Sequence, residues 1–261
     1  MSDYEIRFGG VARLYGIEGL KRLQQAHVCV VGLGGVGSWA AEALARSGVG
    51  KLFLVDQDEV CVSNINRQLP ALTGTVGRPK TDVIAERVKA IAPKCRVLSI
   101  QEFFTAQTVE TILASAYDYV VDAIDGVTNK ALLIASCKAR GLPVVTAGGA
   151  GGRRDPTTIR VADLAESNHD RLLQQVRRKL RDEHGFSRDP KVKFGVTCVF
   201  SPEPQMFPHD DGTVCAEREA GSDTKLDCNS GFGTAAFVTG AFGLAAASVA
   251  VSHLATGAAG S

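Results

Sequence analysis

The chain has 261 residues, of which 45% are hydrophobic and 22% are charged; this ordinary globular composition suffices for one sizeable core or two small ones. Its 29 lysines and arginines nearly balance its 28 acidic residues, so any nucleic-acid surface has to be a local patch. Seven scattered cysteines include no C-x-x-C pair, which argues against a disulfide framework and excludes the usual four-cysteine zinc site.

Strands and helices are predicted in alternation through the first half of the chain. The apolar runs that predict strands are residues 27–31, 52–56, 96–100, 119–123 and 144–146. The amphipathic stretches that predict helices between them are residues 36–46, 80–91, 108–115 and 128–140. This order predicts an α/β fold with a Rossmann-like, mostly parallel sheet and helices on both faces.

Additional strands and helices are expected in the C-terminal half, where the alternation stops. A long amphipathic helix is predicted over residues 170–183. The strand-like stretch at residues 191–204 follows it, and we expect the helix and this stretch to form an insertion on the outer side of the sheet.

The C-terminal tail is strongly apolar, because no Asp, Glu, Lys or Arg occurs after residue 228. Its stretch 232–254, which begins at Phe232 and ends at Leu254, is long enough to cross a bilayer at about 1.5 Å per residue. It is built from Gly, Ala, Ser and Thr more than from Leu or Ile, and no basic cluster flanks it, which favours a helix buried in the core or in a dimer interface. Membrane association stays open as the alternative. The opening "MSDYEIRFGG" is not typical of a signal or transit peptide, so we expect a cytoplasmic protein.

A glycine-rich turn follows the first predicted strand. Gly32, Gly34 and Gly37 satisfy G-x-G-x-x-G, which lets the backbone approach a phosphate and directs a helix N-terminus at it. Asp56, at the end of the second strand, suits ribose hydroxyls. A close packing turn or a nicotinamide dehydrogenase would show the same motif.

Three further side chains favour a nucleoside triphosphate over a nicotinamide. Arg67 and Lys80 supply cations for phosphates, and Asp125 supplies a carboxylate for a metal ion. A dehydrogenase needs no such set, whereas attack on an α-phosphate requires charge-assisted phosphate contacts and a magnesium ligand.

In order and spacing these residues resemble the ATP site of the ubiquitin-activating-enzyme superfamily, over about residues 7–152. The matching positions are Gly32, Gly34, Gly35, Gly37, Asp56, Ser63, Asn64, Arg67, Gln68, Lys80 and Asp125. The resemblance implies ATP as cofactor, with Asp56 on the ribose, Asn64, Arg67 and Lys80 on the phosphates, and Asp125 on magnesium. It implies a catalytic role for Arg67, Lys80 and Asp125, and a reaction in which a carboxylate becomes an acyl adenylate.

The chain departs from that superfamily near its N-terminus. Many members carry R-[F/Y]-x-R there, and the second arginine reaches the ATP of the partner subunit. In this chain Gly10 occupies the position of that second arginine. Arg7 or Arg13 is therefore the candidate to reach the ATP of the partner subunit in a homodimer.

Five blocks resemble one branch of the superfamily, the bacterial tRNA threonylcarbamoyladenosine dehydratases. They are "RFGGVARLYG", "VTAGGAGGRRDPT", "KFGVTCVFSPEP", "DGTVC" and "DCNSGFGTAAFVTGAFG". The resemblance implies ATP-dependent cyclisation of the threonylcarbamoyl group on the adenosine 3′ of the anticodon, with tRNA as partner. It implies one adenylating domain over residues 1–261, in which 1–152 bind ATP and 153–261 form the substrate elaboration and the C-terminal helix.

Two other functions remain open. An adenylyltransferase for a ubiquitin-like sulfur carrier would share the ATP site but would need a groove for a Gly-Gly tail. A non-catalytic sulfur-relay scaffold around Cys228 would bind a sulfur-transfer protein and form no AMP.

Basic residues of the second half are candidates for tRNA contact. On the helix predicted over residues 170–183, Leu172, Leu173, Val176 and Leu180 form an apolar stripe opposite a basic face. A solvated helix face is the alternative interpretation. The candidates are Arg153, Arg154, Arg171, Arg177, Arg178, Lys179 and Arg181.

Cys228 is the cysteine with a candidate catalytic role. Glycines, a serine and an asparagine surround it and indicate an exposed loop ahead of a helix. No basic residue nearer in sequence than Lys225 would activate its thiol, and ring closure needs no thiolate, so an inert loop cysteine is the alternative. Cys198 lies in a strand-like run and is predicted to be a core residue.

Overall fold

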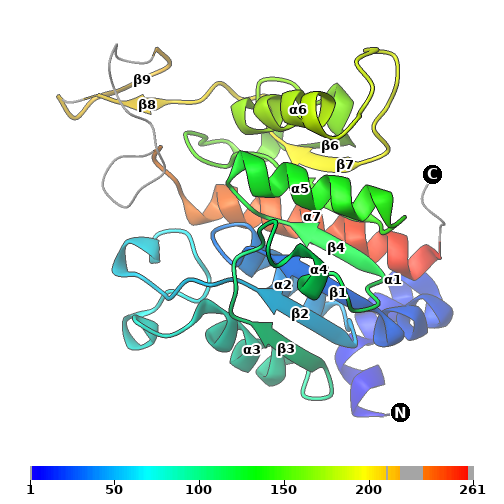
Figure 1. Ribbon diagram of the computed structural model, residues 1–261. Coiled ribbons are helices and arrows are strands. Elements are labelled where there is room, and N and C mark those ends of the chain that lie inside the picture. The colour runs from blue at the N-terminus through cyan, green and yellow to red at the C-terminus, as the bar shows by residue number, and fades with distance from the viewer. Residues whose placement is uncertain (1, 210, 218–231, 258–261) are drawn as a thin grey trace.

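The computed structural model describes residues 2–209, 211–217 and 232–257 (Figure 1). Its centre is a seven-stranded sheet in the order β3-β2-β1-β4-β5-β7-β6. Neighbouring strands pair in parallel except at the edge, where β6 runs antiparallel to β7. The strands are β1 (His27–Val31), β2 (Lys51–Val55), β3 (Arg96–Ile100), β4 (Tyr119–Asp122), β5 (Val144–Ala147), β6 (Arg160–Asp163) and β7 (Thr197–Phe200).

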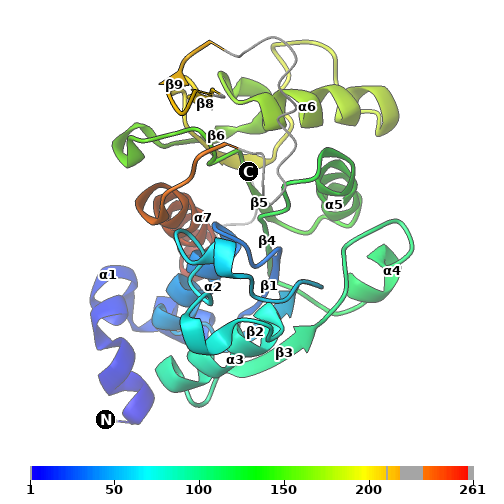
Figure 2. The same ribbon diagram turned by 90° about the vertical axis from the view of Figure 1, so that its left-hand side faces the viewer.

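Helices cover both faces of the sheet, as the view in Figure 2 makes clear. One apolar core lies under α1 (Asp3–Gln25), α2 (Gly37–Arg46), α3 (Lys80–Ile91) and α7 (Ala236–Thr256). A second lies under α4 (Val109–Ile112), α5 (Val127–Ala139) and α6 (Arg171–Glu183). Short 3-10 turns and a two-stranded ribbon complete the described elements: Val62–Asn64, Thr73–Thr75, Pro156–Thr158, Leu164–Glu166, β8 (Phe207–Pro208) and β9 (Val214–Cys215).

The structure confirms the α/β fold predicted from the alternating pattern. The five strands and four helices predicted in the first half are present, and their bounds agree with the predicted ones to within three residues. The sequence pattern did not reveal α1, because Gly16, at φ 79°, interrupts it with a kink. Ser2 and Glu5 form a capping box at its N-terminus, which satisfies backbone donors that would otherwise lack partners.

The prediction that residues 191–204 form an insertion on the outer side of the sheet is wrong. Within that stretch, β7 lies inside the sheet, between β5 and β6, and pairs in parallel with β5. Cys198 and Val199 on neighbouring positions are both fully buried, because helices cover both faces here. An apolar run of this kind is typical of a strand buried on both sides. The full burial of Cys198 confirms the prediction that it is a core residue. Burial also raises the pKa of its thiol to about 12.

Helix α7 combines the length and apolar character of a membrane span with a core position. Its most apolar window of 18 residues has a mean hydropathy of 1.6, yet 56% of that window is buried inside the protein. Small residues along it, among them Gly240, Gly243 and Ala247, are buried against neighbouring elements, and α7 packs closely on α2. Burial by the rest of the protein explains why this helix needs no charged residue.

Candidate functional site

A cleft of about 1280 Å³ opens at the carboxyl ends of the central parallel strands. Strand β1 is flanked by β2 on one side and β4 on the other, so the chain reverses its winding direction between β1 and β4. Loops that leave such a switch point diverge and leave a crevice where ligands bind in open α/β sheets. The fold therefore places the cleft at the position expected for a nucleotide site.

The glycine turn forms the floor of the cleft. Gly32 follows β1 with φ 87°, and its N–H donates to the carbonyl oxygen of Val55 at 2.9 Å. Gly37 is the first residue of α2, and a β-carbon there would lie 1.8 Å from the carbonyl oxygen of Gly32. Only glycine allows this approach, which brings the start of α2 and the cleft-lining Gly34 and Gly35 into the site.

Asp56 is held rigidly beside this turn. Its Oδ2 accepts a hydrogen bond from the N–H of Leu33 at 2.6 Å, and its Oδ1 accepts one from the N–H of Asp58 at 2.8 Å. Burial raises the pKa of the Asp56 carboxyl, whereas Lys80 and the two N–H groups lower it. The carboxylate is thus oriented to accept hydrogen bonds from ribose hydroxyls.

Two cations face the cleft from the loop after β2 and from α3. Lys80 is 5% exposed, and its Nζ donates to Asp58 Oδ2 at 2.8 Å. Arg67 is half-buried, and its Nη1 donates to the carbonyl oxygen of Ser63 at 2.6 Å and to Asn66 Oδ1 at 3.0 Å. Charged donors held in place by neighbours are suited to bind phosphate oxygens.

The side-chain oxygen of Gln68 is a buried hydrogen-bond acceptor at the cleft. Gln68 lines the cleft, and its Oε1 is buried without a hydrogen-bond partner among the residues that the structure describes. A buried polar atom without a partner is costly, and a hydroxyl or amino group of a bound nucleotide would satisfy it. This observation fits ATP to the residues present.

Asp125 lies exposed at the mouth of the cleft, after β4. The backbone before it is fixed by a fully buried ion pair: Lys130 Nζ lies 3.0 Å from Asp122 Oδ2 and donates to the carbonyl oxygen of Ile124 at 2.8 Å. Asp122 also accepts hydrogen bonds from the N–H of Ile124 at 3.0 Å and from the Thr146 hydroxyl at 2.7 Å. The sequence analysis missed this network, although an aspartate inside an apolar strand indicates a buried partner.

The cleft brings together ten of the eleven residues predicted for ATP binding. They are Gly32, Gly34, Gly35, Asp56, Ser63, Asn64, Arg67, Gln68, Lys80 and Asp125; Gly37 lies beneath the turn instead. The sequence analysis missed lining residues of both halves; those of the C-terminal half include Phe232, Thr234 and Thr239. The Thr239 hydroxyl donates to the Arg67 carbonyl oxygen at 3.1 Å, and Asn66 Nδ2 donates to that of Thr234 at 2.8 Å. The N-terminal and C-terminal halves of the chain therefore both contribute to one wall of the cleft.

Arg153 is not at the surface, which corrects its prediction as a tRNA contact. It is 2% exposed, and its guanidinium donates to the backbone oxygens of Gly149, His169 and Glu203. Its Nη2 lies 3.5 Å from Asp170 Oδ2. Burial lowers the pKa of this guanidinium, while Asp170 and Glu203 raise it. Arg153 thus joins the loop after β5 to the start of α6.

The basic residues of α6 are mostly occupied by neighbours. Leu173, Val176 and Leu180 form the buried stripe, as predicted, whereas Leu172, which was predicted to belong to it, is half-buried and lines the cleft. Among the basic side chains, Arg178 and Lys179 pair with acidic residues one turn away, Arg177 donates to Ser167 Oγ, and Arg181 lies over the ring of Phe194. For Arg154 and Arg171, no hydrogen bond or ion pair of the side chain occurs within the described parts of the chain. Cys228 lies outside those parts.

Comparison with known proteins agrees with this geometry. The profile of the ThiF family matches residues 10–257. The tRNA threonylcarbamoyladenosine dehydratases of Haemophilus influenzae and Escherichia coli are 48% and 51% identical to the chain, over 97% and 95% of it and over 95% and 91% of their own lengths. A crystal structure of the Escherichia coli enzyme in complex with ATP has a TM-score of 0.86 and 46% identity, and the match covers 97% of this chain and 96% of that one.

Proposed function

The chain belongs to the ThiF family, and we propose that it is an ATP-dependent tRNA threonylcarbamoyladenosine dehydratase. Its reaction is the cyclisation of the threonylcarbamoyl group on the adenosine 3′ of the anticodon. The observation that carries the proposal is the single cleft in which a glycine turn, two held cations and an exposed carboxylate converge. Close similarity to dehydratases over nearly the whole chain supports the choice of substrate.

The first step is attack on ATP. An oxygen of the threonyl carboxylate attacks the α-phosphorus, the bond from that phosphorus to the pyrophosphate oxygen breaks, and pyrophosphate leaves. Negative charge grows on the phosphate oxygens, and Arg67 and Lys80 stabilise it. Asp56 and the glycine turn hold the nucleoside and the phosphates in position.

The second step closes the ring. The carbamoyl group of the same side chain attacks the acyl carbonyl, and AMP leaves with the former carboxylate oxygen. The net change in the tRNA is the loss of one water. Because nucleophile and electrophile belong to one substituent, binding in the cleft supplies proximity and no enzyme nucleophile is required.

Magnesium is the metal that the site suits. Asp125 presents an exposed carboxylate on a fixed loop at the mouth of the cleft, and magnesium is commonly held by one or two carboxylates together with substrate phosphates. When bound, the ion would neutralise phosphate charge. Asp125 would hold it, and the Asp122–Lys130 pair would keep Asp125 in place.

A homodimer is proposed from the exposed apolar residues of α1. Ile6, Leu14 and Ile17 are 68%, 79% and 70% exposed, and a second copy would cover such residues. Arg7 is occupied by Asp3 and the Ile91 carbonyl, so the exposed Arg13 is the better candidate to reach a partner's ATP. Sedimentation of wild type and Ile17→Asp tests this, since a monomeric wild type would refute the dimer.

We place the exposed Arg154, Arg171 and Arg178 at the tRNA surface. Cations on a substrate elaboration beside the cleft would contact the phosphates of the anticodon stem.

A tRNA substrate and a core position for α7 both fit a cytoplasmic enzyme. We propose the corresponding division of the chain, in which residues 1–152 hold most of the ATP site and 153–261 add the substrate surface and α7.

The decisive experiment uses purified protein, ATP, magnesium and tRNA that bears the threonylcarbamoyl group. Nucleoside mass analysis should show a modified adenosine that is lighter by one water, with AMP and pyrophosphate released. Omission of ATP is the control. An unchanged nucleoside, with AMP formed instead on a sulfur-carrier protein, would favour the adenylyltransferase; partner binding without AMP would favour a relay scaffold.

Cys228→Ser is expected to retain most dehydratase activity. The cyclising nucleophile belongs to the substrate, so no acyl-enzyme thioester forms. The measurement is the rate of cyclised tRNA formation, with ATP–pyrophosphate exchange as the control for adenylation. A loss of more than about a thousandfold in cyclisation with intact exchange would instead place an acyl thioester on the pathway.

A further inference from the structure

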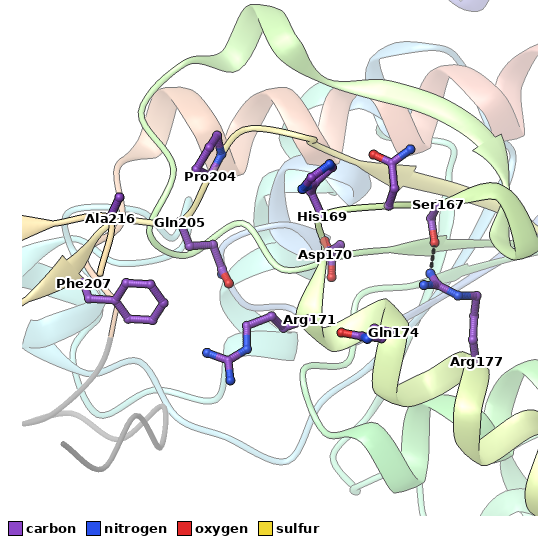
Figure 3. Close-up of a pocket in the computed structure, with 11 residues that line it drawn as sticks. Ser167, His169, Asp170, Arg171, Gln174, Arg177, Pro204, Gln205, Phe207 and Ala216 are labelled. Atoms are coloured by element: carbon purple, nitrogen blue, oxygen red, sulfur yellow. Dashed lines mark hydrogen bonds between the residues drawn. The ribbon is translucent and has the colours of Figure 1, made fainter. Parts of the chain in front are cut away.

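A second pocket, of about 550 Å³, adjoins the ATP cleft. It lies between the start of α6, the loop that precedes it and the β8 region, as Figure 3 shows. Its volume falls in the range of about 300–1,000 Å³ that is usual for small-molecule sites. Arg171 and Gln205 line both this pocket and the cleft, so the two cavities meet at these side chains.

The chemistry of the lining suits a polar, planar ligand without positive charge. Phe207 turns an aromatic ring toward the pocket (Figure 3), and Asn168, Gln174 and Gln205 offer amides. Among the described lining residues the only carboxylate is that of Asp170, and it is occupied, since it accepts hydrogen bonds from the N–H groups of Gly149 and Leu173 and pairs with Arg153. Bases are recognised in this way, by an aromatic surface and by hydrogen bonds to their edges.

The wall between the two cavities is rigid. Buried Arg153 and Asp170 tie Gly149 of the cleft to His169 of the pocket through hydrogen bonds to both. A β-carbon at Gly148 would lie 2.2 Å from Asp170 Oδ2, so the loop after β5 approaches α6 as closely as glycine allows. His169 has φ 53°, the one positive value at a non-glycine position in the described chain. Strain of this kind is commonly stored at binding sites.

Arg171 stands out from the other cations of α6 at the junction of the cavities. Within the described residues no partner engages its guanidinium, whereas Arg177, Arg178, Lys179 and Arg181 all have neighbours. Figure 3 shows its side chain extended between Gln205 and Gln174. A free guanidinium at this point can hold a carboxylate or phosphate with two parallel hydrogen bonds.

We infer that this pocket receives the modified adenosine of the tRNA as a nucleoside turned out of the anticodon loop. The inference rests on the proposed function. The base packs beside Phe207, its edge meets the amides, and its N6 substituent crosses the shared wall past Arg171 so that the threonyl carboxylate enters the ATP cleft. Extrusion of a base is the general solution for enzymes that act on atoms held within a nucleic-acid stack.

Gln174→Trp tests the pocket without altering the ATP cleft. Gln174 is exposed on α6 and lines only this pocket, so an indole there fills the cavity while the fold tolerates it. We expect the KM for modified tRNA to rise at least tenfold, the ATP Kd to stay within twofold, and the preference for modified over unmodified tRNA to disappear. The matched control is Gln107→Trp, at an exposed position that lines neither cavity.

Arg171→Ala tests the junction. It should lower kcat/KM for modified tRNA by about ten- to a hundredfold, as expected for loss of a hydrogen bond to a charged group. Arg188→Ala removes the same charge just beyond α6, from a side chain that is 73% exposed and paired with Asp182, and should change kcat/KM less than twofold. This control separates a local contact from general attraction to phosphates.

The outcomes separate this inference from the proposed function. If wild type cyclises modified tRNA and Gln174→Trp keeps the wild-type KM and preference, the pocket inference is overturned alone. The pocket inference is also overturned if Gln107→Trp is as impaired as Gln174→Trp, because the effect would then be unspecific. If wild type leaves the tRNA unchanged, the proposed function fails and the inference fails with it.

Discussion

Asp125→Asn is expected to reduce ATP-dependent turnover to background without destabilising the protein. The asparagine amide is neutral and would no longer hold the magnesium ion that we propose Asp125 binds against the phosphates. Asp125 is exposed, and no hydrogen bond or ion pair of its side chain occurs within the described part of the chain. The substitution should therefore change the free energy of unfolding only slightly. Turnover is measured with modified tRNA and saturating ATP, and thermal unfolding is measured in parallel.

The matched control lies three residues earlier. Asp122→Asn makes the same chemical change at a fully buried position and leaves Lys130 without its ion-pair partner. Loss of one member of a buried pair costs about 3–5 kcal/mol, so this variant should unfold at a clearly lower temperature. If Asp125→Asn retains turnover in the presence of a chelator, magnesium has no place in the mechanism.

Arg67→Ala and Lys80→Ala are each expected to lower kcat by about a hundredfold or more. Both cations face the cleft, and each is proposed to stabilise charge that grows on the phosphates in the transition state. Loss of Lys80 leaves Asp58, whose side chain is 52% exposed, so water can solvate the freed carboxylate and the cost to folding is small. The effect should therefore appear in kcat at saturating ATP, with unfolding nearly unchanged.

Lys89→Ala is the control for Lys80→Ala. Lys89 lies on the same helix, α3, but near its other end, where it is exposed and lines no part of the cleft. Its replacement should change kcat less than twofold. Near-normal turnover in both Arg67→Ala and Lys80→Ala would refute the assignment of the phosphate site.

The nucleotide site was predictable because its parts are local in sequence. A strand, a glycine turn and a helix form one unit, and the alternation of such units implies a parallel sheet whose carboxyl ends meet at one edge. Asp56, Arg67, Lys80 and Asp125 each follow or begin an element at that edge. Their convergence in one cleft therefore follows from topology that the hydrophobic pattern reveals.

Only the tertiary structure decided the burial of several segments that their local sequence leaves open. Arg153 looks like a surface cation in sequence, yet distant acceptors at His169 and Glu203 enclose it. The stretch that contains β7 was predicted to lie on the outer side of the sheet, yet β7 lies within the sheet, between β5 and β6. For helix α7 the sequence left the core, a dimer interface and a membrane as alternatives, and its packing against α2 and the sheet decides for the core. Burial depends on contacts between segments far apart in the chain, and no local pattern records which segments those are.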